Sequence, residues 1–188
     1  MKSNLAFGLD ESGPISYLTI ETGLPVWVAF STRKGGISDS PYATANMAYH
    51  VGDDSLRVKE NRRLLSVAVT GREEVPVYTA SQVHGNRFLL LDCSTPMAVN
   101  ELENQAADSL ITASREILLG IMTADCLPVL LIDRQARAVA AVHAGWRGIL
   151  TRVVPRTITA MEVNYGVNPA DLLVLLGPCI SRCCYQVG

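Results

Sequence analysis

The chain is poor in the features that would mark several function classes. Its 188 residues include only three histidines, 6% aromatic residues and 18% charged residues, and the formal net charge is −2. The 16 lysines and arginines are scattered, so the sequence predicts no nucleic acid and no anionic membrane surface as a partner. No apolar run approaches the roughly 18 residues of a membrane span. The hydrophobic fraction of 48% is instead typical of a globular protein with a sizeable core.

A leader segment and a disulfide framework are also missing from the pattern. The stretch that follows Lys2 is not apolar for long enough to resemble a signal peptide. Five cysteines are an odd number, and the adjacent Cys183 and Cys184 could not easily bridge each other. Reduced thiols are typical of the cytosol, so we predict a cytoplasmic protein.

Short apolar runs dominate the secondary-structure signal. Runs rich in β-branched residues and bounded by turn formers predict strands, and nearly continuous runs predict strands buried on both faces. We predict strands over residues 25–32, 75–83, 87–91, 109–112, 118–123, 127–133, 138–143 and 172–176, a long loop over 33–46, and helices over 55–69 and 145–164, with Pro155 causing a kink or a late start. The fold class is therefore α/β or α+β, a layered sandwich of mixed β-sheets flanked by helices, in a single domain over residues 1–188.

Two of the three histidines lie beside glycine at the ends of predicted strands. His84 occurs in a QVHG segment and His143 in a VHAG segment, while Cys126 begins a strand in a TADCLP segment. A hairpin turn centred between residues 134 and 135 would place Cys126 directly opposite His143, with Cβ atoms about 4.5–5.5 Å apart. The three side chains therefore form a candidate site.

One thiolate and two imidazoles suit zinc, and copper proteins also use this ligand set. Zinc held by three protein ligands keeps a fourth position for water or substrate and lowers the pKa of bound water toward about 7. Asp125, beside Cys126, is a candidate general acid or base. Arg147, in a turn before a predicted helix, and Arg33 are candidate anion ligands.

The residues alone leave other interpretations open. A metal-free thiol hydrolase would use Cys126 as nucleophile and His143 as base. A non-enzymatic protein would carry the same residues as structural side chains. We interpret His50 as structural and the other four cysteines, at positions 93, 179, 183 and 184, as inert.

Seven segments, in order along nearly the whole chain, resemble the YfiH family, whose members are also described as laccase-domain proteins, polyphenol oxidases or purine nucleoside phosphorylases. They are residues 32–38 (TRKGGIS), 61–62 (NR), 82–85 (QVHG), 107–112 (ADSLIT), 123–128 (TADCLP), 142–148 (VHAGWRG) and 177–180 (GPCI).

The resemblance implies a layered α/β fold like that of cytotoxic necrotizing factor. It implies a metal, zinc or alternatively copper, held by His84, Cys126 and His143. The activities that it implies are phosphorolysis of adenosine, inosine and S-methyl-5′-thioadenosine, and deamination of adenosine. Copper-dependent oxidation of phenols is the alternative activity. The remaining expected site residues are Asp125 and Cys126 as catalytic groups and Arg33, Asn46, Gln82 and Arg147 as substrate ligands.

Family members usually continue for some tens of residues beyond the segment that ends at Gly188. We therefore expect the domain to be C-terminally incomplete here, and part of the substrate pocket to be affected. Purine nucleosides and phosphate are the expected partners, and the sequence does not specify an oligomeric state.

Overall fold

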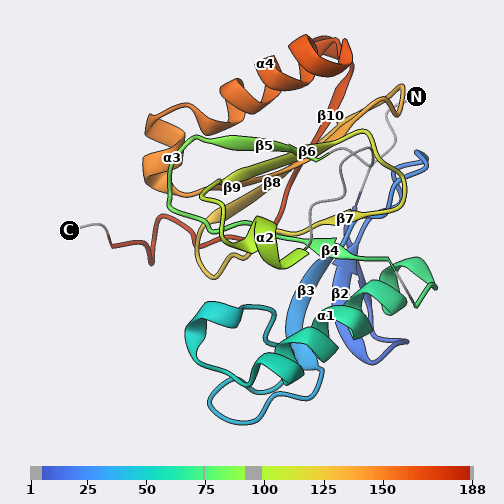
Figure 1. Ribbon diagram of the computed structural model, residues 1–188, viewed down its shortest axis with the longest axis vertical. Coiled ribbons are helices and arrows are strands. Elements are labelled where there is room, and N and C mark those ends of the chain that lie inside the picture. Colours follow the sequence, from blue (N-terminus) through green and yellow to red (C-terminus); the bar gives the residue numbers. More distant parts are fainter. Residues whose placement is uncertain (1–5, 74, 92–98, 187–188) are drawn as a thin grey trace. The chain divides into compact units, whose positions relative to one another are not determined.

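The computed structural model describes residues 6–73, 75–91 and 99–186, and the chain divides into two compact units, residues 1–77 and 78–188 (Figure 1). Each unit is described by itself. The single domain predicted over residues 1–188 stays a prediction.

The first unit contains a three-stranded antiparallel sheet and one long helix. The strands β1 (Gly8–Asp10), β2 (Ile15–Thr19) and β3 (Phe30–Gly35) are hydrogen-bonded in that order. Helix α1 (Ser55–Thr70) begins after Asp54, whose carboxylate accepts the Leu56 N–H, and it confirms the predicted helix. The strand predicted over residues 25–32 begins only at Phe30. Before it, the Val28 carbonyl accepts a hydrogen bond from the Thr19 side chain.

One buried amide fixes the loop between β3 and α1. The Asn61 Nδ2 group donates to Ser38 Oγ at 2.9 Å, to the Asn46 carbonyl at 2.8 Å and to the Thr44 carbonyl at 3.3 Å. Its Oδ1 accepts the Ile37 N–H at 2.8 Å. The loop predicted over residues 33–46 is thus held by an interior side chain of α1, and the short 3₁₀ helix η1 (Tyr49–Val51) follows it.

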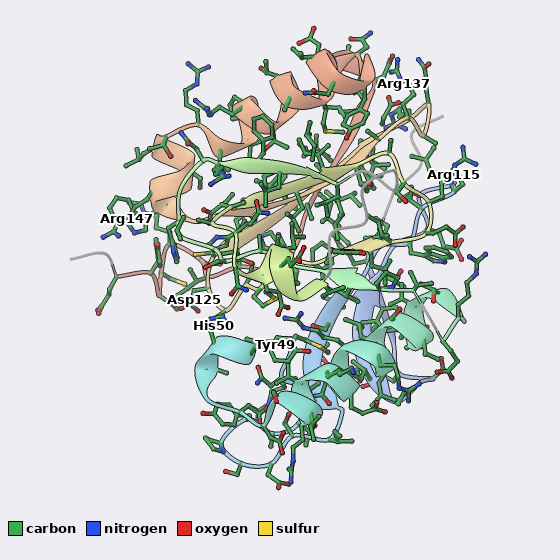
Figure 2. The ribbon with its side chains drawn as sticks, in the orientation of Figure 1. Tyr49, His50, Arg115, Asp125, Arg137 and Arg147 are labelled. Atoms are coloured by element: carbon green, nitrogen blue, oxygen red, sulfur yellow. The ribbon has the colours of Figure 1, made fainter. Side chains whose placement is uncertain are left out.

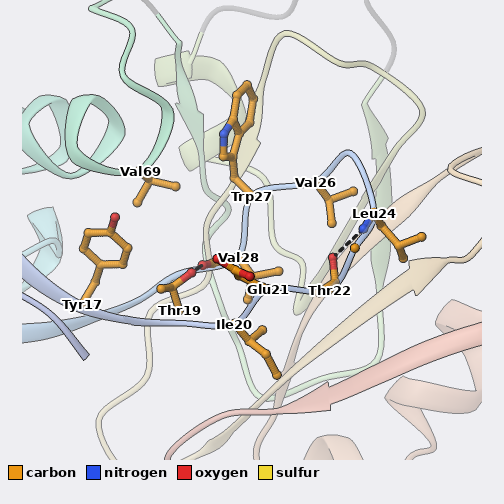
Figure 3. Close-up of a pocket in the computed structure, with 11 residues that line it drawn as sticks. Tyr17, Thr19, Ile20, Glu21, Thr22, Leu24, Val26, Trp27, Val28 and Val69 are labelled. Carbon is orange, nitrogen blue, oxygen red and sulfur yellow. Dashed lines mark hydrogen bonds between the residues drawn. The ribbon is translucent and has the colours of Figure 1, made fainter. Parts of the chain in front are cut away.

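A shallow pocket of about 360 Å³ also lies within the first unit (Figure 3). Its walls come from β2, the segment that follows it, and Val69 of α1. None of its lining residues belongs to the predicted site.

The second unit is built on a mixed five-stranded sheet. Its order is β10 (Leu172–Leu176), β8 (Leu127–Asp133), β9 (Val139–Ala144), β6 (Ser109–Thr112) and β5 (Phe88–Leu91). Only β5 and β6 run parallel to each other, whereas the other neighbours are antiparallel. The predicted class of mixed sheets flanked by helices is confirmed.

Helices and short elements cover the two faces of this sheet. Because successive residues of a strand face opposite sides, Ile111 of β6 packs with the cluster beneath α4 (Val153–Tyr165), and Leu110 packs with a second cluster that includes Leu102 of α2 (Val99–Glu103). Figure 1 shows α4 and α2 on opposite sides of the strands. The short β4 (Val77–Tyr78), β7 (Leu118–Leu119), α3 (Trp146–Leu150) and η2 (Pro169–Asp171) complete the elements.

The helix predicted over residues 145–164 is two helices. It breaks after α3, where Arg152 takes a left-handed φ of 64°, and α4 then begins at Val153. Pro155 consequently lies in the first turn of α4, where no N–H is needed. The late start that the proline predicted is confirmed.

Among the described residues, no helix is long and apolar enough to cross a bilayer.

A buried carboxylate stabilises the turn between β8 and β9. Asp133, which is fully buried, accepts hydrogen bonds from the Arg137 backbone N–H at 3.1 Å and from its Nε and Nη2 at 2.6 and 3.0 Å. The Arg137 side chain beside it holds the pKa of Asp133 below its usual value.

Replacing this carboxylate should lower the stability of the folded protein, by an amount that depends on pH. Asp133→Asn should lower the free energy of unfolding at pH 7 by about 2 kcal/mol, because hydrogen bonds to a charged group are lost. A carboxyl group whose pKa is lowered by folding stabilises the folded protein at pH values above its unfolded pKa of about 4. This stabilisation is lost as the pH falls through the folded-state pKa. The difference in the free energy of unfolding between Asp133→Asn and the unmodified protein, measured with urea, should therefore be smaller at pH 3 than at pH 7. The exposed-pair variant Glu60→Gln should stay within about 0.5 kcal/mol; a pH-independent loss in Asp133→Asn would contradict the account.

Candidate metal centre

The structure brings His84, Cys126 and His143 together. One ligand atom from each lies within 4.8 Å of the others, and Cys126 Sγ is 3.8 Å from His84 Nε2. The two imidazole rings meet edge to face, with centroids 4.8 Å apart and planes at 78°. Donors around tetrahedral zinc are about 3.3–3.7 Å apart, given bond lengths of about 2.0–2.3 Å. A small inward shift would therefore let the three atoms share one ion.

Strand β9 and the start of β8 place two of these side chains, and a turn places the third. His143 is the fifth residue of β9 and is 3% exposed, while Cys126 immediately precedes β8 and is half-buried. His84 is exposed in the turn between β4 and β5, where its φ of 59° lies in the left-handed region that non-glycine residues seldom adopt. Such a backbone persists only where its surroundings hold it in place.

The hairpin register predicted for Cys126 is wrong by two residues. Pro128, not Cys126, lies opposite His143, because the turn is centred between residues 135 and 136. Ala136 lies in the left-handed region at φ 55°, within the six residues that separate the last pair of the ladder, Ile132 and Val139. An even shift keeps every side chain on its face. Cys126 therefore approaches His143 diagonally, and the two still share a site.

Gln82 ties the histidine turn to the loop that carries Cys126. Its Nε2 donates to the Met122 carbonyl at 2.6 Å, and its Oε1 accepts the Met122 N–H at 2.7 Å. Both halves of the amide thus pair with one backbone residue, as a neighbouring strand would. The predicted substrate contact of Gln82 stays a prediction.

Asp108, to which the sequence analysis gave no role, meets both histidine segments. Its carboxylate is fully buried and accepts His143 Nδ1–H at 2.8 Å, as well as the backbone N–H groups of His84 at 2.9 Å, Gly85 at 2.7 Å and Val83 at 3.3 Å. Burial works to raise the pKa of Asp108, but the hydrogen bonds from His143, Gly85 and Val83 outweigh it and lower the pKa. The carboxylate is therefore charged in the folded protein.

Cys126 is not activated by its own surroundings. Burial raises the pKa of its thiol, and the negative charges of Asp125 and Asp108 raise it further. A thiolate nucleophile needs the opposite environment, with a cation or helix N-terminus nearby. These surroundings disfavour a metal-free Cys/His hydrolase, whereas a bound cation would favour the thiolate as a ligand.

A glycine leaves the space between the three ligands open. A Cβ atom on Gly145 would lie 2.8 Å from His84 Cδ2, 3.2 Å from Cys126 Sγ and 3.7 Å from His143 Cε1. Its backbone, with φ of −66°, would accept any residue, so the site and not the chain conformation requires glycine there. The donor set and this open space fit a single zinc or copper ion.

Two further predicted residues lie in the second unit. Asp125 is exposed beside Cys126, and its carbonyl accepts the Ile180 N–H at 3.0 Å. Arg147 is exposed on α3, with its guanidinium over the Trp146 ring, 5.1 Å from the centroid, and Figure 2 shows it projecting from the surface. Both side chains are accessible to a solute, and their roles stay predictions.

The other predicted residues belong to the first unit. Arg33 is exposed on β3, and the amide of Asn46 is engaged locally, with Nδ2 donating to Asp53 Oδ2 at 2.9 Å and Oδ1 accepting the Ala48 N–H at 3.0 Å. Substrate binding by either residue stays a prediction. His50 is exposed in η1.

The cysteines expected to be inert are only partly described. The cysteines at positions 179, 183 and 184 are free and exposed. Cys126 is also free, but it is half-buried. The expectation for Cys93 falls outside the described residues.

Filling the space at Gly145 should weaken metal binding. Gly145→Ala should lower the affinity for zinc about 5–150-fold, because a methyl group forced among three ligands costs on the order of 1–3 kcal/mol. Competition with a chromophoric chelator would measure the affinity. Gly8→Ala is the matched control, since nothing lies within 4 Å of its Cβ. Equal zinc affinities for the Gly145→Ala and unmodified proteins would show that this space is not the metal site.

Comparison with known proteins gives the same family that the motifs resemble. A family profile described as "Multi-copper polyphenol oxidoreductase laccase" matches residues 27–188. A protein of Corynebacterium glutamicum named purine nucleoside phosphorylase is 39% identical over 163 residues, which are 87% of this chain and 64% of the relative. A Mycobacterium tuberculosis protein of the same name is 40% identical over 157 residues, covering 84% and 60%. This chain thus spans about three fifths of the length of these curated relatives.

A solved structure agrees with the fold. The crystal structure of the hypothetical protein YfiH of Bacillus licheniformis superposes with a TM-score of 0.83 at 29% sequence identity, covering 95% of this chain and 67% of that one. The family profile extends over most of the chain and includes all three converging ligands. The chain is therefore a member of the YfiH family, the multi-copper polyphenol oxidoreductase laccase family of the profile.

Proposed function

We propose that the protein is a zinc-dependent purine nucleoside phosphorylase. The observation that carries this proposal is the convergence of three metal-ligating side chains within 4.8 Å in a chain whose curated relatives are named purine nucleoside phosphorylase. The chain covers only part of those relatives, so activity, substrates and partners are proposed here for the whole protein.

In the proposed reaction, a phosphate oxygen attacks the anomeric carbon of the ribose and the bond from that carbon to the purine nitrogen breaks. The base takes up a proton and leaves, and the sugar becomes ribose 1-phosphate. Adenosine, inosine and S-methyl-5′-thioadenosine are the proposed substrates. The last of these gives the corresponding 5-methylthioribose 1-phosphate.

The protein's own residues would divide the work as follows. His84, Cys126 and His143 would hold the ion, which when bound supplies Lewis-acid chemistry beside the substrate. The exposed carboxylate of Asp125 would move the proton. Arg147 would bind phosphate, since a guanidinium matches phosphate oxygens in geometry and charge. Arg33, Asn46 and Gln82 are proposed to complete the nucleoside and phosphate contacts.

We also propose adenosine deamination at the same site. Water would attack C6 of the purine, ammonia would leave, and inosine would form. Zinc deaminases of nucleobases work at this carbon with a nearby carboxylate as proton carrier. Asp125 is the candidate carboxylate here.

Copper-dependent oxidation of phenols is the second candidate, favoured by the family's description. The described residues contain one group of three metal-ligating side chains. Four-electron oxygen chemistry generally needs several coppers, so this count supports the nucleoside reaction instead.

Free thiols among the described cysteines also suit the cytosolic location that we propose.

Product analysis tests the proposed reaction directly. Zinc-loaded protein incubated with adenosine should release adenine only when phosphate is present, and inosine independently of phosphate. His84→Ala should abolish both products because one of three ligands is lost. Arg156→Ala, exposed on α4, should retain them. Either activity surviving in a folded His84→Ala protein would refute the metal-centred reaction.

Metal analysis separates the two candidate functions. Protein purified without added metal should contain zinc in an amount equimolar to the chain, measured by inductively coupled plasma mass spectrometry. Copper in that amount, together with oxygen consumption in the presence of a phenol, would favour the oxidase instead.

A further inference from the structure

Asp108 is the one described carboxylate that contacts two of the three ligand segments, and nothing in the proposed reaction uses it. It directly precedes β6, and the register of β6 with β9 continues by one step, so that Asp108 lies opposite His143. The His143 N–H donating to the Asp108 carbonyl at 2.8 Å agrees with this pairing. Side chains opposed in an antiparallel pair share a face. The strand register thus delivers the carboxylate to the imidazole.

The two carboxylate oxygens have different partners. Oδ1 accepts both His143 Nδ1–H and the backbone N–H of His84, whereas Oδ2 accepts the backbone N–H of Gly85 at 2.7 Å and that of Val83 at 3.3 Å. Three successive N–H groups therefore converge on one anion. A single oxygen links the backbone of one metal-ligating histidine to the ring of the other.

We propose that Asp108 is a positioning residue for the metal centre, which fixes the tautomer of His143 and the left-handed turn that presents His84. This inference rests on the proposed metal site and not on the identity of the substrate.

The tautomer follows from the hydrogen bond. A carboxylate oxygen only accepts, so His143 must carry its proton on Nδ1, and Nε2 then keeps the free lone pair that binds a metal. Metal-ligating histidines are commonly oriented in this way by a carboxylate on the other ring nitrogen.

The turn follows from the backbone contacts. His84 occupies φ of 59°, and the three N–H groups of residues 83–85 find their acceptors on Asp108. Without that anion, these groups would need water or another acceptor, and the strained turn would lose what holds it. His84 Nε2 would then no longer be held 3.8 Å from Cys126 Sγ.

Asp108→Asn is a sharp test because no orientation of an amide fits. With its oxygen toward His143, the NH₂ group faces the N–H donors of Gly85 and Val83. With the amide reversed, the NH₂ group meets the His84 N–H and forces His143 to protonate Nε2 and lose its metal-binding lone pair. The substitution preserves size and removes the negative charge together with the acceptor pattern.

Asp133→Asn is the matched control. Asp133 is equally buried and accepts three hydrogen bonds from Arg137, but it lies at the far end of β8 from Cys126, about 20 Å along the strand. Figure 2 shows Arg137, its partner, and Asp125 at opposite ends of the unit. Loss of fold stability alone would affect both variants, whereas loss of positioning would affect only Asp108→Asn.

The experiment measures cobalt(II) affinity and its absorption spectrum in folded protein at fixed pH, with each variant's folding checked by circular dichroism. Asp108→Asn should weaken cobalt binding about 10–100-fold and change the ligand-field bands. Asp133→Asn should bind within about twofold of the unmodified protein and keep its spectrum. Unchanged affinity and spectrum in Asp108→Asn, or an equal loss in Asp133→Asn, would overturn the proposal.

A measurement on the unmodified protein keeps the test valid if Asp108→Asn does not fold. Nitrogen-15 NMR of the histidine rings in metal-free protein should show His143 protonated on Nδ1, and its protonation on Nε2 would overturn the proposal. Neither readout requires nucleoside turnover. A protein that shows both effects but cleaves no nucleoside would leave the positioning role intact and refute the proposed function alone.

Discussion

The hydrogen bonds to the buried carboxylate of Asp108 are the interaction on which the rest of the site depends. They connect a strand, a strained turn and an imidazole that are far apart in sequence, and the anion stays charged because four N–H groups point at it. A buried charge is costly unless it is fully paired. This pairing makes the local arrangement specific, since a shift of β6 against β9 by even one residue would turn the carboxylate away from His143.

The remaining parts of the site follow from the ends of the five-stranded sheet. The ladder between β8 and β9 brings Cys126 near His143, and the Gln82 amide secures the histidine turn to the loop before Cys126. Gly145 keeps the middle of the group open. The hydrophobic clusters on both faces of the sheet pack the strands that carry Cys126 and His143.

Much of this arrangement could be predicted from the sequence. Continuous apolar runs gave β6, β8 and β10 with their observed bounds, because strands buried on both faces carry a signal that depends little on context. Helix α1 begins after Asp54 and ends before Gly71, residue types that are favoured at helix caps. The ligands themselves were predicted from strand ends, glycine neighbours and the family motifs.

Other features depend on tertiary structure that local patterns do not encode. The register of the β8–β9 hairpin was missed because it rests on the left-handed conformation of Ala136, a residue type that seldom adopts it. The role of Asp108 depends on the pairing of β6 with β9, and the one local signal for it is a carboxylate directly before a fully buried strand. The requirement for Gly145 comes from side chains around it and not from its own backbone.

The central claim is that one ion binds a thiolate and two imidazoles in this family member. X-ray absorption spectroscopy of the zinc-loaded protein tests it most directly, because it reports the type and distance of the ligand atoms. The account predicts one sulfur at about 2.3 Å and two imidazole nitrogens at about 2.0 Å, with the sulfur lost in Cys126→Ser. A zinc shell of oxygen and nitrogen alone in the unmodified protein, or a sulfur that persists in Cys126→Ser, would contradict it.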